Sequence, residues 1–143
     1  MELKGGDKLA KALSDIGGKM TGSVRVGFLE GANYPDGTPV AAVAFWNEFG
    51  TLNIPPRPFF RTTIDEKSSA WGGRLAKAAT HYDYDGGQVL ELMGQTMAED
   101  IQQSINGWTD PGNAQSTIDK KGFDKPLIDT GDMLRSVDYE VQQ

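Results

Sequence analysis

The chain contains no cysteine and a single histidine, and both shortages narrow its possible chemistry. Without cysteine, a disulfide scaffold, a thiolate metal site and a cysteine nucleophile are excluded. Long hydrophobic runs are also missing: the longest, Val40–Trp46, spans seven residues, far fewer than the ~20 that cross a bilayer. The first residues lack the apolar core of a signal peptide, so we expect a protein that is made and used in a cytoplasm.

Positive charge is scarce as well. The net charge is −6, which argues against binding of nucleic acid through phosphate contacts, because such contacts demand clustered Lys and Arg. Residues 1–80 hold ten Lys or Arg against eight Asp or Glu, whereas residues 81–143 hold four against twelve. The acidic second half is either a solvated surface or a surface that complements a neighbouring copy.

The 143 residues suffice for one domain, and hydrophobic periodicity predicts its elements. Spacings of three and four predict helices over residues 9–20 and 89–105, and Gly17-Gly18 and Gly22 are expected to end or fray the first. Alternation predicts strands over 23–29 and 137–141, with Arg25 opposite Asp138 or Glu140. Further helices are predicted from a Thr38 cap with Pro39 at the first position to Gly50, from Pro58 to Ala78, and over 131–135. Breaks are predicted at 30–38, 54–58 and 81–87, with a long polar loop at about 107–125. The fold class is therefore α+β, a small, mostly antiparallel sheet packed against a long helix and shorter helices in one domain, 1–143.

Two short segments invite a catalytic or metal interpretation. His81, Asp83 and Asp85 offer three potential ligands, but the spacing fails the calcium-loop pattern and a solvated turn explains them better, so we predict no cofactor and no metal. Asp129-Thr130-Gly131 resembles the catalytic loop of retroviral-type aspartic proteases, which makes Asp129 the remote enzyme alternative. Asp129 and Thr130 as helix caps explain the same residues more simply.

Two longer stretches carry a more specific resemblance. One is Val43-Ala-Phe-Trp-Asn-Glu-Phe-Gly-Thr51 followed by Ile54-Pro-Pro-Arg-Pro-Phe-Phe-Arg61. The other runs from Ser116 to Gly131 and continues through Met133-Leu134 and Ser136-Val137. In order and spacing they resemble the tail-completion or head–tail joining proteins of long-tailed bacteriophages, which include virion morphogenesis and minor tail proteins.

The resemblance implies a structural virion protein and no enzyme. It implies a homo-oligomeric ring, with six copies expected, at the neck of the particle, where it joins the tail tube or tail terminator to the head-connector or stopper protein. Assembly would take place in the host cytoplasm, without a membrane. DNA would only pass through the lumen, lined by the acidic half, and would not be bound specifically. A tail terminator or other minor tail ring is the near alternative, and a soluble host regulator is another.

The first stretch also supplies the candidate interface. Prolines stiffen an extended arm, and two arginines flanking two phenylalanines have the composition of an interface hot spot. We expect one phenylalanine to be buried in the subunit and the other to face a partner. Asn47 and Glu48 are either solvated caps or partners in an intersubunit hydrogen bond, and Gly50 is expected to be a left-handed cap. The candidate interface residues are Asn47, Glu48, Pro56, Arg57, Phe59, Phe60 and Arg61.

Overall fold

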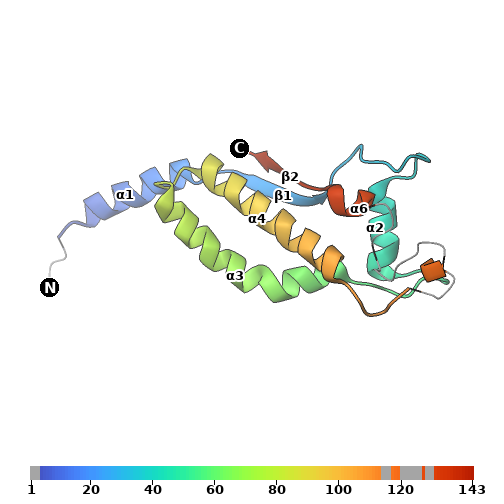
Figure 1. Ribbon diagram of the computed structural model, residues 1–143. Coiled ribbons are helices and arrows are strands. Elements are labelled where there is room, and N and C mark those ends of the chain that lie inside the picture. Colours follow the sequence, from blue (N-terminus) through green and yellow to red (C-terminus); the bar gives the residue numbers. More distant parts are fainter. Residues whose placement is uncertain (1–3, 114–116, 120–126, 128–130) are drawn as a thin grey trace.

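The computed structural model describes residues 4–113, 117–119, 127 and 131–143. The elements in chain order are α1 (Gly6–Lys19), β1 (Ser23–Phe28), α2 (Val40–Phe49), α3 (Phe59–His81), α4 (Gly86–Gly107), α6 (Asp132–Arg135) and β2 (Val137–Gln142). The predicted α+β class is confirmed, because a small antiparallel sheet packs against helices, of which α4 is the central one (Figure 1).

Helix α4 lies between the sheet and α3, so it is covered on two sides (Figure 1). Its apolar stripe at intervals of three and four supplies buried side chains to both faces, and each such side chain contributes roughly 1.5–3 kcal/mol. Val89 and Met93 belong to one cluster with α3, while Ile101 and Ile105 belong to a larger cluster that includes Phe59. The Trp71 Nε1 of α3 also donates to Asp100 Oδ2 of α4 over 2.7 Å.

The two strands pair antiparallel in the described part of the chain. Val26 lies opposite Tyr139, and Arg25 lies opposite Glu140, which is one of the two partners predicted for it. Gly94 lets α4 approach this sheet closely, because a Cβ there would overlap the Tyr139 ring and approach Val24. The sheet therefore packs on α4 through a contact that only glycine allows.

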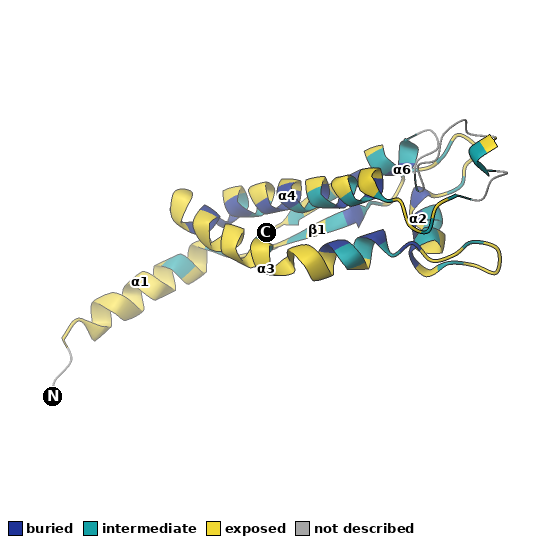
Figure 2. Cartoon of the chain, turned by 60° about the horizontal axis from the view of Figure 1, so that its bottom comes forward, coloured by how far each residue is buried: buried dark blue, intermediate teal, exposed yellow. Residues whose placement is uncertain are grey.

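The N-terminal helix α1 departs from the rest of the molecule. It continues through Gly17-Gly18 to Lys19, so of the glycines predicted to end or fray the helix only Gly22 lies beyond its end. Each glycine inside a helix weakens it by about 1 kcal/mol. It points away from the body, and all of it except Ile16 is exposed (Figures 1 and 2). Leu9 and Leu13 of the predicted apolar stripe are 61% and 59% exposed. Only the end of the stripe, at Met20, packs on the body.

Two helix starts lie beside the predicted positions. Pro39 is the N-cap of α2 rather than its first residue, and its ψ of 132° is extended, as N-caps usually are. Thr38 is not the cap, because the helix begins one residue later than predicted, at Val40, and the Thr38 N–H donates to Asp36 Oδ1. Pro58 is likewise the N-cap of α3, which passes Gly72-Gly73 and ends at His81.

The loop predicted at about 107–125 begins where α4 ends. Residues 108–113 have no regular structure and 117–119 form a helical turn. The rest of that predicted loop, with Asp129 and Thr130, lies outside the described residues.

Candidate subunit interface

Helix α2 is apolar on all sides, which is unusual for a helix at the surface of a domain. Its sequence is Val-Ala-Ala-Val-Ala-Phe-Trp-Asn-Glu-Phe. One face, with Val40 and Ala44, is buried in the core. The other face presents three aromatic side chains to solvent: Phe45, Trp46 and Phe49 are 61%, 44% and 52% exposed. The chain thus carries an aromatic face that a single copy does not cover.

A groove runs beside this face, which we call the aromatic groove. Its lining residues are Phe28, Ala41, Ala44, Phe45, Glu48, Phe49, Phe59, Phe60 and Arg61, and its volume is about 250 Å³. The rings of Phe45 and Phe49 are 4.7 Å apart between centroids. The Arg61 guanidinium lies 4.8 Å from the Phe49 ring centre, a cation–π contact at the open edge. The groove is therefore apolar inside, with a cationic group at its rim.

Glu48 has a role inside the subunit that the sequence interpretation did not anticipate. Its carboxylate is buried and accepts hydrogen bonds from the backbone N–H groups of Phe60 (2.9 Å) and Arg61 (3.1 Å). These are among the N–H groups that the first turn of a helix leaves without an intrahelical partner. The Arg61 Nε donates to the same carboxylate over 2.7 Å. Glu48 therefore caps α3 from α2 and fixes the angle between the two helices that form the groove.

The Arg57 side chain also forms its hydrogen bonds within the chain. It is 7% exposed, and its guanidinium donates to the carbonyl oxygens of Pro111 (3.0 Å, from Nε) and Gly112 (2.9 Å, from Nη2). Its own backbone N–H donates to the carbonyl of Asn47. Arg57 thus fastens the segment after α4 to the arm between α2 and α3.

The remaining candidate residues divide between core and surface. Phe59 is 1% exposed and belongs to the core, whereas Phe60 is half-buried and lines the groove. Pro56 is exposed. Asn47 is half-buried, with its side-chain amide donating to the Val43 carbonyl over 2.9 Å.

Gly50 ends α2, as predicted, with its N–H donating to the Trp46 carbonyl. Its φ of 78° is positive but its ψ of 171° is extended, so it is not the left-handed cap that we expected. A Cβ at this position would lie 2.9 Å from the Ile54 carbonyl oxygen, and glycine is therefore required.

The three exposed aromatics of α2 were missed as site residues, although they lie in the stretch that carries the resemblance. The signal was available, because seven consecutive apolar residues in a surface helix leave some of them uncovered whichever face packs inward.

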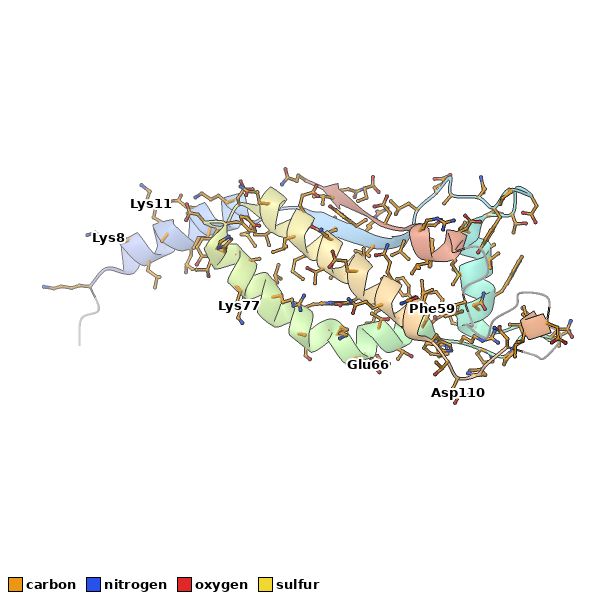
Figure 3. All side chains as sticks on the ribbon, viewed as in Figure 1. Lys8, Lys11, Phe59, Glu66, Lys77 and Asp110 are labelled. Carbon is orange, nitrogen blue, oxygen red and sulfur yellow. The ribbon has the colours of Figure 1, made fainter. Side chains whose placement is uncertain are left out.

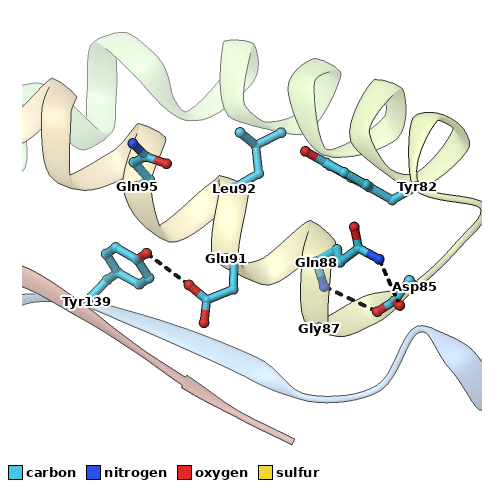
Figure 4. A pocket seen from close by; sticks show the side chains of 8 residues that line it. All are labelled: Tyr82, Asp85, Gly87, Gln88, Glu91, Leu92, Gln95 and Tyr139. Carbon is cyan, nitrogen blue, oxygen red and sulfur yellow. Dashed lines mark hydrogen bonds between the residues drawn. The ribbon is translucent and has the colours of Figure 1, made fainter.

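A second cavity lies between the end of α3, the start of α4 and β2 (Figure 4). It is open and polar, with a volume of about 510 Å³. The Asp85 carboxylate accepts hydrogen bonds from the side-chain amide and from the backbone N–H of Gln88. Both bonds lower the pKa of Asp85, and the side-chain bond has the larger effect. The Tyr139 hydroxyl donates to Glu91 Oε2 over 2.9 Å, and this bond raises the pKa of Tyr139. The carboxylates of Asp85 and Glu91 therefore both form hydrogen bonds that stabilise the fold.

The His81–Asp85 segment does not assemble a ligand set. Asp83 pairs with Lys19 at 3.8 Å, Asp85 caps α4, and the His81 ring stacks edge-on against Tyr82. Within the described ranges, no three His, Cys, Asp or Glu side chains converge as metal ligands. None of the helices in those ranges combines the length and hydrophobicity that crossing a membrane requires.

No protein-family model matches this chain, and comparison with the curated proteins and with the solved structures found no match.

Proposed function

We propose that this chain is a structural virion subunit that assembles with copies of itself into a ring at the neck of a long-tailed phage and joins the tail to the head connector. The observation that carries the proposal is the uncovered aromatic face of α2 beside the aromatic groove. Its residues belong to the stretch, 43–61, on which the resemblance to tail-completion proteins depends. An aromatic cluster with an arginine at its rim is the composition of a protein-binding hot spot.

The size of this surface favours assembly over tight pairwise binding. Three aromatic side chains that are each about half exposed offer roughly 100 Å² apiece, or about 7 kcal/mol when fully covered. Association of two proteins costs about 4–15 kcal/mol before any contact is gained. One such contact alone therefore gives a weak dimer, whereas a closed ring, in which every copy uses the surface, is stabilised by all of its contacts together.

The acidic second half has a place in the same proposal. In β2 the exposed positions include Asp138 and Glu140, and Glu99 is exposed on α4. Carboxylates that face the lumen of a ring repel the phosphates of passing DNA, so DNA moves through without sticking. Replacing Asp138 and Glu140 by lysine should then slow DNA release from assembled particles without preventing their assembly.

A joining assay tests the function directly. An extract of cells infected with a phage that lacks this gene supplies filled heads and separate tails. Adding the purified chain should produce joined particles visible by electron microscopy, and Phe49→Asp should abolish joining. Lys77→Asp, at an exposed position on α3, is the matched control and should join normally. The proposal is wrong if heads and tails join equally well without the chain, or if the chain binds neither of them in a pull-down.

A further inference from the structure

The molecule has a second uncovered apolar surface, at the end opposite to the aromatic groove. Helix α1 projects from one end and α2 lies at the other, as Figures 1 and 2 both show. Leu9, Leu13, Ile16 and Met20 recur at spacings of four, three and four, which places them on a single side of the helix. This spacing is the pattern by which a helix binds in an apolar groove of another protein.

Helix α1 has few contacts within its own chain that stabilise it. It has 14 residues, and isolated helices of about 12–15 residues are only marginally stable in water even when rich in alanine. Gly17 and Gly18 lie inside it, with open space around both. Within the chain, the body covers only its last turn, through Met20. A helix of this length and composition is stable when its apolar side is covered by another surface.

The aromatic groove offers that cover in chemistry and in size. About 250 Å³ exceeds the ~150 Å³ cavity that holds one benzene molecule, so the groove has room for leucine-sized side chains. The described part of α1 and its lead-in carry four lysines against two aspartates. Arg61 at the rim of the groove has the same sign as these lysines, and the exposed acids Asp65 and Glu66 lie further along α3, outside the lining of the groove. Figure 3 shows Lys8 and Lys11 on α1 and Glu66 on α3.

We infer that α1 of one copy lies in the aromatic groove of the next copy, with Leu9 and Leu13 as the anchoring side chains. This inference rests on the proposed function, because it names the contact by which the ring forms. The two surfaces lie at opposite ends of one chain and differ from each other, so the contact is head-to-tail. Repetition of a head-to-tail contact closes into a ring or continues as a filament.

The lack of natural cysteine makes disulfide trapping a clean test. Leu9→Cys and Leu13→Cys on α1 are each mixed with Phe49→Cys at the groove, and the mixtures are oxidised mildly over a range of protein concentrations. A disulfide forms only when the two Cα atoms come within about 7 Å, so a mixed dimer reports the contact itself. Lys77→Cys, exposed on α3, is the matched control in place of Phe49→Cys.

We expect a mixed dimer with Phe49→Cys for at least one of the two α1 variants, in at least tenfold excess over the mixture with Lys77→Cys. Three results overturn the inference: absence of the mixed dimer at every concentration, equal trapping by Lys77→Cys, or efficient homodimers of the α1 variants alone, which would show that α1 pairs with α1. The joining assay separates the two proposals. Joining without the mixed dimer refutes the α1 contact alone, and the mixed dimer without joining refutes the neck function alone.

Discussion

Replacing Glu48 by glutamine tests whether a carboxylate on α2 holds the start of α3. The carboxylate accepts from the N–H groups of Phe60 and Arg61 and from the Arg61 guanidinium, while only 6% of the residue is exposed. Glutamine keeps the shape but turns one acceptor into a donor, so one of the two partly buried backbone N–H groups faces an NH₂ group. An unsatisfied buried donor costs about 1–3 kcal/mol.

Loss of the negative charge of Glu48 adds to this destabilisation. A negative charge at a helix N-terminus contributes about 0.3–1 kcal/mol, and about 2 kcal/mol when partly buried. The ion pair adds little, since half of the Arg61 side chain is exposed. The expected total is about 3 kcal/mol, and for a chain of 143 residues this lowers Tm by roughly 10 °C.

Thermal and urea unfolding followed by circular dichroism measure the loss. Glu66→Gln, at an exposed position on the same α3, is the matched control and should change stability by less than about 0.5 kcal/mol. Arg61→Met removes the ion pair but leaves both backbone donors with their acceptor, and should cost about 1 kcal/mol or less. If Glu48→Gln costs no more than Arg61→Met, the capping argument is refuted and the ion pair is what matters.

Three further predictions concern the fold around the interface. Gly94→Ala should lower the free energy of unfolding by about 1–3 kcal/mol, because a Cβ there overlaps the Tyr139 ring of β2. Gly72→Ala has open space around it and should raise the free energy of unfolding by about 0.5–1 kcal/mol; urea titration of both variants checks the opposite signs. Arg57→Lys loses the two hydrogen bonds from the guanidinium to the Pro111 and Gly112 carbonyls, so limited proteolysis should cut the segment after α4 several times faster than in the parent. Unchanged cleavage together with unchanged stability would contradict this role. The pKa of Asp85 is depressed, chiefly by the Gln88 side chain, so the carboxylate stabilises the fold above the unfolded pKa of about 3.8 and the contribution disappears as pH falls through the folded pKa; Asp85→Asn should flatten the acid limb of a stability-versus-pH curve, and an unchanged limb would refute this.

Several parts of this architecture follow from local pattern. The stripe over 89–105 predicts α4, because apolar residues at helical spacing stay on one side whatever surrounds them. The alternation in β1 and β2 limited the partner of Arg25 to Asp138 or Glu140, and the register of the sheet selects Glu140. The same kind of pattern predicted helix α1, but helical spacing does not say what covers the apolar side, and the structure leaves Leu9 and Leu13 exposed.

The sequence did not predict where two of the candidate interface residues lie in the structure. Residues 47–61 were recognised as a functional stretch, but Glu48 and Arg57 were expected at a surface and instead lie inside the subunit. The side chains of both residues hydrogen-bond to groups 12 or more positions away, since Glu48 meets the start of α3 and Arg57 meets the segment after α4. No spacing rule within one helix or strand reports such contacts.

What the sequence determined by itself is therefore the set of helices and strands and the apolar character of α2, because both depend on residues close together in the chain. Only the tertiary structure decided which face of α2 is buried, that Glu48 caps α3, and that α1 and the aromatic groove end up at opposite ends of the molecule. The physical reason is that burial and capping are settled by whichever groups folding brings into contact, and those contacts join residues far apart in the chain.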